Sequence, residues 1–580
     1  MPEFNPNPPG SMADSIPMTD RIRQAVLEAL GDGRTVFVFP SEIAASSWLT
    51  RTLVETGARA LPNHRFIGWD AFKAQVFVGD HEARPTTKVV RTLFARLLMD
   101  ENLRKPFLLT MPPPERAALS ARFAPLVATA LPALRQIPEG SSPSLLDWRA
   151  IRERYAAFMA ERGLYETSWV QRKADKPACP YFLAYPDLTE DWTDYEAAIK
   201  AMPEARVLLA SDLPAQPVEA ARFPTVVDES RAVLLKIRKA LAAGADPAGI
   251  MISVADPART LPVLAREAAV AGVALDLREG KPLAESAGGR LLADIVAVSR
   301  TGRSFEAMRR LLLDMSRPWR NPAAAGQLIR LGVQKHILAP IPGQPGDIWE
   351  LSMGTKDDDE IRGFYRKLRL QCDKVASASG FSALRAAMDT FKQVFLDEEA
   401  WDETRNDEIA RCIAELDILD ESAKEAGIEG IGKAADIWLE HLASVRYLKV
   451  SRQPGIPVYR FPAAAGAMPE LHFVMNLSLK SAVAAARPLS FLRDDERQKA
   501  GARDRDISGG LIRLLAGSGD TVHLSWADEG PEGTRAPHPC IVSASPASLG
   551  MPYRRDDWLL NLEEDFTTLA EGPPLFPIQK

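Results

Sequence analysis

The sequence predicts an α/β protein in which two parallel-sheet domains carry large helical insertions. From Asp228 to Leu277, amphipathic helices alternate with short apolar strands, which is typical of a parallel sheet covered by helices. Nearer the amino end, Arg34–Trp48 has the same strand–turn–helix order, and stretches of helical periodicity separate the two regions. The 580 residues exceed the capacity of one hydrophobic core, so several domains are expected.

The first α/β region is predicted from short apolar runs and the helices that follow them. Its expected strands are Val36–Phe39, Phe66-Ile67, Tyr181–Tyr185 and Ala205–Ser211. A helix precedes the first strand, and another runs from Ser41 to about Glu55. Residues 86 to about 165 repeat apolar positions every three to four residues, so a helical insertion is expected between the second and third strands.

The second α/β region is predicted in two pieces around a helical block. Strands are expected in "GIMISVAD" and "VALDL", and again in "PVYRF", "LHFVMNLSL" and "DTVHLSW". Residues 290–445 between them are mainly helical. We therefore expect a helical domain of about 150 residues as an insertion in the second α/β region.

Composition excludes several classes of function. The net charge is −6, so any contact with nucleic acid must use a local patch. The four cysteines lie far apart without a C-x-x-C pair, which favours reduced thiols over a zinc or iron–sulfur site and suits a cytoplasmic protein. No uninterrupted apolar run approaches the ~18 residues of a membrane span, so no membrane contact is expected.

The chain carries no catalytic signature that predicts an enzyme. A nucleotide-binding loop after the first strand would supply backbone N–H groups and a lysine, but this chain has Pro40-Ser41-Glu42. Gly427–Ala434 has the spacing of a phosphate loop but ends in alanine and follows a helix, so we interpret it as a helix end. The acids of Lys356–Glu360 are interpreted as a helix first turn rather than a metal site. We expect no ATP, metal or other cofactor.

Four segments resemble the inactivated superfamily I helicase-like part of AddB/RexB-type proteins, the partners or fused regions of PD-(D/E)XK nucleases in bacterial double-strand-break processing. The segments are "TVFVFPSEIAASSW", "NHRFIGWDAFKAQVF", the stretch from Asp228 to Ser286, and "FPAAAGAMPELHFVMNLSLKSAVAAARPLSFLRDDERQ". The resemblance implies two RecA-like domains in a degenerate superfamily I helicase architecture. It also implies DNA, in single strands or duplex ends, and a helicase or nuclease subunit as partners.

The sequence departs from active members of that family at three motifs. The phosphate loop is replaced by Pro40-Ser41-Glu42, Tyr185-Pro186 stands at the metal-binding Asp-Glu, and Gly517 stands at the arginine that contacts the γ-phosphate. ATP hydrolysis needs those charges at the transferring phosphate, so the resemblance implies a non-catalytic chain.

The resemblance also divides the chain into domains. Residues 1–18 are expected to be a tag or tail, 19–225 the first RecA-like domain, and 226–298 with 446–548 the second. Residues 299–445 are expected to form the helical insertion domain, and residues 549–580 a tail or linker toward a missing nuclease domain that would be fused to this chain. That missing domain would make the parent protein or complex a PD-(D/E)XK exonuclease.

The best candidate for a nucleic-acid contact is the segment Arg300–His336, which holds eight Lys/Arg against two acids. Phosphate contacts are predicted for Arg303, Arg309, Arg310, Arg317 and Arg320, and stacking on an unpaired base for Trp319. The alternative is an ordinary amphipathic helix with solvated arginines. Two hypotheses follow: a DNA-binding helicase relic that serves a nuclease in repair and recombination, or a protein scaffold that holds a partner subunit with little DNA contact. A concealed ATPase is a third.

Overall fold

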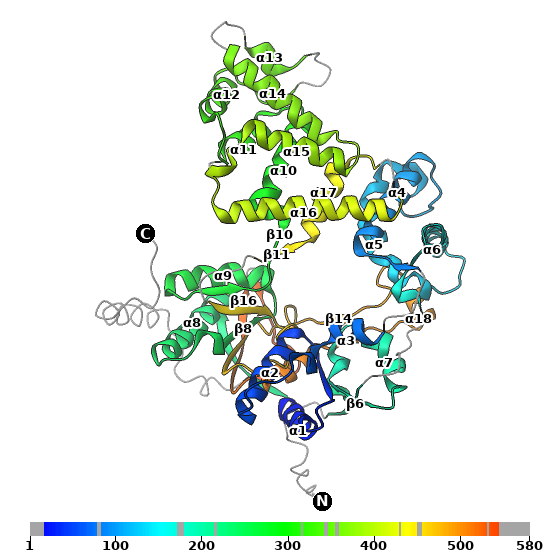
Figure 1. Ribbon diagram of the computed structural model, residues 1–580, viewed down its shortest axis with the longest axis vertical. Coiled ribbons are helices and arrows are strands. Elements are labelled where there is room, and N and C mark those ends of the chain that lie inside the picture. Colours follow the sequence, from blue (N-terminus) through cyan, green and yellow to red (C-terminus); the bar gives the residue numbers. More distant parts are fainter. Residues whose placement is uncertain are drawn as a thin grey trace, which may run out of the picture.

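The computed structural model describes residues 17–77, 83–170, 179–213, 217–314, 317–340, 346–353, 359–428, 431–448, 455–530 and 533–543. The tails expected at 1–18 and 549–580 lie outside these residues, apart from positions 17 and 18, as do Lys356–Asp358 of the acidic segment. The fold is mixed α/β, with two parallel sheets in the lower part of Figure 1 and helical units above and beside them. The predicted class, an α/β protein with parallel sheets and many helices, is confirmed at this level.

The first sheet has four parallel strands in the order β2-β1-β5-β6. Every residue of β1 and β5 is buried, because helices cover both faces of a parallel sheet. The strands are β1 (Val36–Phe39), β2 (Phe66–Gly68), β5 (Tyr181–Ala184) and β6 (Ala205–Leu208). The accompanying helices are α1 (Met18–Leu30), α2 (Glu42–Thr56), α3 (Trp69–Val76) and α7 (Trp192–Lys200).

The second sheet places seven parallel strands in the order β18-β7-β16-β13-β8-β12-β9. The strands are β7 (Val218–Thr225), β8 (Ile250–Val254), β9 (Leu275–Leu277), β12 (Ile456–Arg460), β13 (Leu471–Met475), β16 (Thr521–Gly530) and β18 (Ile541–Ser543), with β17 (Gly533–Thr534) antiparallel to β16. Its helices include α8 (Val226–Ala242), α9 (Pro257–Ala271) and α19 (Ser508–Ala516). The predicted domain boundary at 225 is wrong by one strand, because β7 hydrogen-bonds to β16 and β18 of this sheet.

The first helical insertion leaves and rejoins the first domain at a short parallel pair, β3 (Arg84–Pro85) and β4 (Leu164–Tyr165). It consists of α4 (Lys88–Arg104), η3 (Pro114–Phe123), α5 (Ala124–Ala130), η4 (Leu131–Gln136) and α6 (Pro143–Glu161). These bounds agree with the predicted insertion at about 86–165. By length and composition alone, one run among the described residues, Pro114–Gln136, is long and apolar enough to cross a membrane, although charged residues such as Arg116 and Arg122 interrupt it. It nevertheless changes between 3-10 and α turns and packs on α4.

The second helical insertion begins and ends at an antiparallel pair, β10 (Lys281–Pro282) and β11 (Arg446–Tyr447). Its helices are α10 (Ala287–Arg300), α11 (Phe305–Leu313), α12 (Pro322–Gln334), α13 (Ile348–Ser352), α14 (Asp359–Ala376), α15 (Phe381–Phe395), α16 (Glu403–Glu425) and α17 (Ala434–Ser444). The predicted start at 299 is too late. Leu292 and Ile295 of α10 are buried among these helices, so the helical domain starts before α10.

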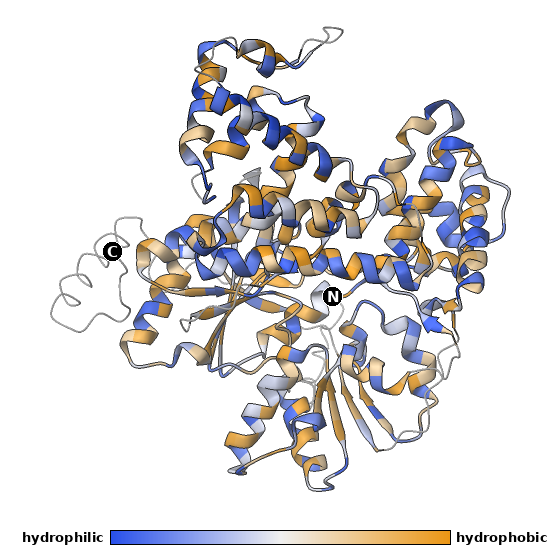
Figure 2. Cartoon of the chain, turned by 45° about the horizontal axis from the view of Figure 1, so that its top comes forward, coloured by the Kyte–Doolittle hydropathy of each residue, from blue (hydrophilic) through white to orange (hydrophobic). Residues whose placement is uncertain are grey.

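Two hydrophobic cores connect parts of the chain that are distant in sequence. One joins the two helical insertions, since Leu93 and Trp148 of the first belong to the same buried cluster as Phe391 and Trp438 of the second. Arg96 and Glu440 form an ion pair of 3.5 Å across this junction. The other core joins the two sheets. Figure 2 shows that the strands of both sheets are largely apolar.

Candidate functional site

The loop after β1 is the position at which a nucleotide-binding domain would hold phosphates. Here the polar side chains of the loop are hydrogen-bonded to other groups of the protein. The Ser41 hydroxyl caps α2 by accepting from the Ala44 N–H at 3.1 Å, and it donates to the Ala463 carbonyl at 2.6 Å. The Glu42 carboxylate accepts from the Gly68 N–H at the end of β2, at 3.0 Å. Pro40 offers no N–H. Carboxylate and hydroxyl are therefore both engaged within the protein.

The partner of this loop is the segment 461–468, which follows β12 in the second sheet domain. The Trp48 indole N–H donates to the Gly466 carbonyl at 2.8 Å, and the Met468 N–H donates to the Ser47 hydroxyl at 2.7 Å. Gly466 has φ of 81°, a conformation that favours glycine. The first turns of α2 are thus hydrogen-bonded to the second domain, and we call this contact the inter-sheet junction (Ser41, Ser47 and Trp48 against Ala463, Gly466 and Met468).

A shared hydrophobic core supports the inter-sheet junction. Phe37, Phe39 and Trp48 of the first domain belong to one buried cluster with Phe461 and Trp526 of the second. Trp48 is 1% exposed and stacks on Phe39, with ring centroids 6.0 Å apart. Because these apolar side chains are buried against each other, separation of the two sheets would expose apolar surface and cost free energy.

The other two altered motif positions also have structural partners. Tyr185, which follows β5, is fully buried with φ of 50°, and its hydroxyl donates to the Met18 carbonyl at 3.0 Å. Burial raises the pKa of this phenol above its usual value. At the end of α19, a Cβ on Gly517 would lie 2.6 Å from the Thr19 hydroxyl oxygen, so the site has no room for an arginine without rearrangement.

The predicted base-stacking residue, Trp319, lies in the helical core. It is 8% exposed, and its ring makes edge contacts with Phe391 and Phe395. The stacking prediction is therefore wrong for this conformation, because both ring faces are covered by the protein. The sequence could not distinguish base stacking from burial, since a tryptophan among arginines can equally well pack its ring into the protein core while the arginines face solvent.

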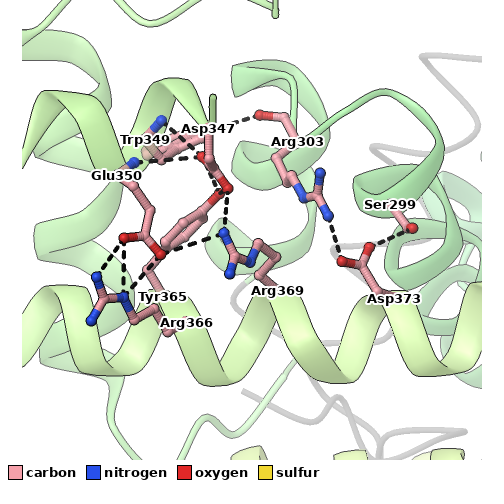
Figure 3. A network of polar contacts seen from close by, with 9 residues as sticks. All are labelled: Ser299, Arg303, Asp347, Trp349, Glu350, Tyr365, Arg366, Arg369 and Asp373. Carbon is pink, nitrogen blue, oxygen red and sulfur yellow. Dashed lines mark hydrogen bonds and ion pairs between the residues drawn. The ribbon is translucent and has the colours of Figure 1, made fainter. Parts of the chain in front are cut away.

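Two of the predicted phosphate-binding arginines are used internally. Arg317 donates to the Leu311 carbonyl at 2.9 Å and to Asp294 at 2.6 Å, and its side chain is 4% exposed. Figure 3 shows Arg303 paired with Asp373, which also accepts from Ser299. These contacts hold α10, α11 and α14 together, so the predicted phosphate role is wrong for Arg317 and is not favoured for Arg303.

Figure 3 also shows why this part of the helical domain is rich in charge. Asp347 accepts from the Tyr365 hydroxyl and from Arg369, while Glu350 pairs with Arg366 and Arg369. Burial and the Asp347 carboxylate raise the pKa of Tyr365. The network fixes α13 against α14 and leaves no group poised for chemistry.

The remaining predicted arginines, Arg309, Arg310 and Arg320, are exposed. Arg309 forms a hydrogen-bonded ion pair with Glu306 at 2.9 Å, and these hydrogen bonds lower the pKa of Glu306. Arg310 pairs with Asp294 at 3.0 Å. Leu311 and Leu312 face the core, as the amphipathic alternative predicted, and Met315 lies outside the described residues.

A hollow of about 510 Å³ lies between α10 and the end of α11. We call it the arginine hollow; it is lined by Arg290, Ala293, Asp294, Arg309, Arg310, Leu313, Asp314 and Arg317. Its four arginines outnumber its two aspartates, so its lining is positively charged. The predicted cluster is thus brought together only in part: Arg309, Arg310 and Arg317 share the hollow, whereas Arg303, Trp319 and Arg320 do not line it. Sequence reasoning missed Arg290, since it lies on the preceding helix.

A buried polar cluster lies at the carboxyl end of β13, beside the middle of β16 in the second sheet. The fully buried Glu229 accepts from the Asn476 N–H at 2.7 Å and from the Ser525 hydroxyl at 2.6 Å, both through Oε1. Its Oε2 has no hydrogen-bond partner among the described residues. Arg535 donates to Asn476 Oδ1 at 2.6 Å and so ties the segment after β17 to this cluster. Desolvation raises the pKa of Glu229 to about 6 from 4.5.

The raised pKa predicts an unusual pH dependence for the second sheet. Because folded Glu229 holds its proton more tightly than the unfolded chain does, its contribution to stability falls as the pH rises from about 4.5 to about 6. The loss amounts to about 2 kcal/mol. We expect the stability of the native chain relative to Glu229→Gln to decline by this amount between pH 4 and pH 7, measured by hydrogen exchange in β13 and β16.

The native chain alone cannot show this effect cleanly. Burial lowers the pKa of His472, also in the second sheet, to about 4, so that histidine contributes stability that is lost as the pH falls from 6.5 toward 4. The two pH dependences oppose each other over the same range, which makes the comparison with the variant necessary. A difference that stays constant with pH would show that the pKa of Glu229 is the same in the folded and unfolded states, and one that grows as the pH rises would show that folding lowers this pKa; either result contradicts the prediction.

The first domain and the helical domain have recognisable relatives. Residues 22–209, the parallel α/β unit with its insertion, match the family model described as the Treponema TP0900 N-terminal P-loop domain. Residues 284–448, the helical unit bounded by β10 and β11, match the model described as the Treponema TP0900 fourth helical domain. Residues 22–209 are thus similar to a domain described as a P-loop domain, although Pro40-Ser41-Glu42 carries neither the glycines nor the lysine of such a loop.

Over most of its length the chain is similar to a single larger protein. An uncharacterized protein of Treponema pallidum (strain Nichols) is 23% identical to it over 579 residues, which cover 88% of this chain and 72% of the relative.

Proposed function

We propose that this chain is the non-catalytic, helicase-like part of a cytoplasmic DNA double-strand-break nuclease, either as a subunit of a complex or fused to the nuclease. In this proposal the two parallel sheets are a pair of RecA-like domains whose nucleotide site has been replaced by protein contacts. The chain binds DNA, in single strands or duplex ends, and positions it for the nuclease and a partner helicase subunit.

The observation that carries this proposal is the inter-sheet junction. In a nucleotide-driven motor the two domains must move relative to each other when ATP binds between them. Here the Ser41 hydroxyl, the Trp48 indole and a shared core connect the domains directly at the first-strand loop. A body that is fixed in this way supports a scaffold or a DNA guide better than it supports a motor.

The alternative function, a protein scaffold with little DNA contact, is favoured by a different observation. Arg303, Arg309, Arg310 and Arg317 all form ion pairs within the chain. An arginine that is already paired binds phosphate less strongly, because the phosphate must displace the internal carboxylate or share the guanidinium group with it. The slope of DNA affinity against salt concentration decides between the two functions.

We expect the purified chain to bind oligonucleotides with an affinity that falls steeply with salt, and to show no response to Mg-ATP in either affinity or melting temperature. A nucleotide present at 100 times its Kd would stabilise its site by about 2.7 kcal/mol, so binding would be visible in a melting curve. A clear rise in melting temperature with Mg-ATP would contradict the non-catalytic assignment. Absence of salt-dependent DNA binding would favour the protein scaffold.

A further inference from the structure

The aromatic side chains that the structure describes are buried or half-buried. None of the Phe, Tyr and Trp residues in the described part of the chain is exposed. Proteins that hold single strands commonly stack successive bases on exposed aromatic rings. None lines the arginine hollow, where Leu313, 46% exposed, is the largest apolar side chain. The charged groups there are four guanidinium groups and the carboxylates of Asp294 and Asp314.

The guanidinium groups of the arginine hollow are held in place by its two buried or half-buried acids. Asp294 accepts from Arg310 at 3.0 Å through Oδ1 and from Arg317 at 2.6 Å through Oδ2. Asp314 lies 3.3 Å from Arg317. Each pair uses only part of a guanidinium, which has five N–H donors in a planar fork. Among the described residues, the exposed Arg310 is paired only with Asp294, so its other N–H groups can donate to a second oxygen ligand.

The rim of the hollow supplies two further cations. Arg290 is exposed, and no ion pair involves it within the part of the chain that the structure describes. Arg309 is half-exposed and paired with Glu306, which lies outside the lining and is itself 59% exposed. An exposed pair of this kind contributes little to stability and exchanges readily with solvent. A phosphate group can therefore replace Glu306 as the partner of Arg309.

We infer that the arginine hollow is a phosphate clamp that grips the nucleic-acid backbone without reading bases; this inference rests on the proposed DNA-binding function. Its volume of about 510 Å³ lies within the usual range of ligand pockets, and its concave, cation-lined shape suits phosphate oxygens. Phosphate contacts position a nucleic acid but carry no sequence information. Leu313 contacts the sugar in this arrangement.

The first test compares an oligothymidine with a base-free deoxyribose-phosphate oligomer of the same length. A phosphate clamp binds both with affinities within about twofold, because base stacking contributes nothing. The combined variant Arg290→Ala, Arg309→Ala, Arg310→Ala removes three cations. The slope of log K against log salt concentration should therefore become less steep by about two to three, and binding should weaken on the order of 100-fold at 0.1 M salt. All three side chains are exposed, so the fold is retained, and circular dichroism verifies this.

The second test looks for a gain of affinity, which misfolding cannot mimic. Glu306→Gln removes the carboxylate that holds Arg309, and we expect oligonucleotide binding to tighten by up to about fivefold at 0.1 M salt. Glu196→Gln is the matched control, since it removes the same charge from an i,i+4 pair with Lys200 on α7 of the first domain. The control should change the affinity by much less.

The outcomes separate the clamp from the proposed function. Strong preference for the oligothymidine over the base-free oligomer overturns the clamp while leaving DNA binding in place. An unchanged affinity in the triple variant overturns it as well, since binding then occurs elsewhere. If neither oligomer binds even at low salt, both the clamp and the DNA-binding form of the proposed function are wrong, and the protein scaffold stands.

Discussion

Replacing Trp48 with alanine is expected to destabilise the inter-sheet junction by about 3–5 kcal/mol, the usual cost of deleting a buried aromatic ring. Trp48 is 1% exposed, stacks on Phe39 and donates to the Gly466 carbonyl. Its loss leaves a cavity in the core that joins the sheets and an unpaired carbonyl in the second domain. We expect the two sheet domains to lose their cooperative protection and to exchange amide hydrogens independently.

The measurement for Trp48 is hydrogen exchange resolved by peptide, because a chain with several domains does not unfold in two states. Trp48→Phe retains a ring but no N–H, so it should lie between the native chain and Trp48→Ala. Val54→Ala is the control, since Val54 is on the same helix but 75% exposed, and such positions change stability by about 0.5 kcal/mol or less. Equal protection in Trp48→Ala and Val54→Ala would show that the junction does not hold the sheets together.

Replacing Arg317 with alanine is expected to destabilise the helical domain by about 3 kcal/mol or more, because it leaves Asp294 and the Leu311 carbonyl without this donor in a buried setting. The Arg317 side chain is 4% exposed and contacts α10, α11 and Asp314. Asp294 keeps its contact with Arg310, which limits the loss. Local unfolding of α10 and α11, again measured by hydrogen exchange, reports the effect.

Two variants make the Arg317 prediction specific. Arg309→Ala removes an exposed i,i+3 pair nearby and should destabilise the helical domain far less than Arg317→Ala does. Arg317→Lys retains the charge but cannot reach the carbonyl and both carboxylates with one ammonium group, so an intermediate loss is expected. If Arg317→Ala were no more destabilising than Arg309→Ala, the buried contacts of Arg317 would not contribute measurably to the free energy of unfolding.

The central strands were predictable because their sequences are apolar over four to five residues between turn signals. Val36–Phe39 and the strand at Ile250–Val254 are buried at every position, as continuous apolar runs indicate. Domain limits were less predictable. The strand Val218–Thr225 has one buried residue, Ala220, among half-buried and exposed ones, and nothing in it indicates which of the two sheets it joins. The helix Ala287–Arg300 has a normal amphipathic pattern, and its place in the helical core depends on its neighbours.

The candidate site was predictable in composition but only partly in geometry. A cluster of eight cations in Arg300–His336 is visible in the sequence, and Arg309 and Arg310 are exposed as expected. Whether a given arginine faces solvent or an internal acid depends on residues elsewhere, such as Asp294 for Arg317 and Asp373 for Arg303. Trp319 is buried for the same reason, since α15 covers it with Phe391 and Phe395.

The sequence by itself determined that the chain forms parallel α/β units with helical insertions, and that the turn after the first strand lacks the glycines and lysine that hold phosphates. These properties are local, because strand burial, helix periodicity and turn chemistry depend on residues that are close together in the sequence. Only the tertiary structure decided what fills that turn, since Ser41 and its partner Ala463 are 422 positions apart. It also decided which arginines remain exposed. The apolar pattern of a helix or strand determines which face is buried, whereas the packing of distant segments determines which part of the chain covers that face.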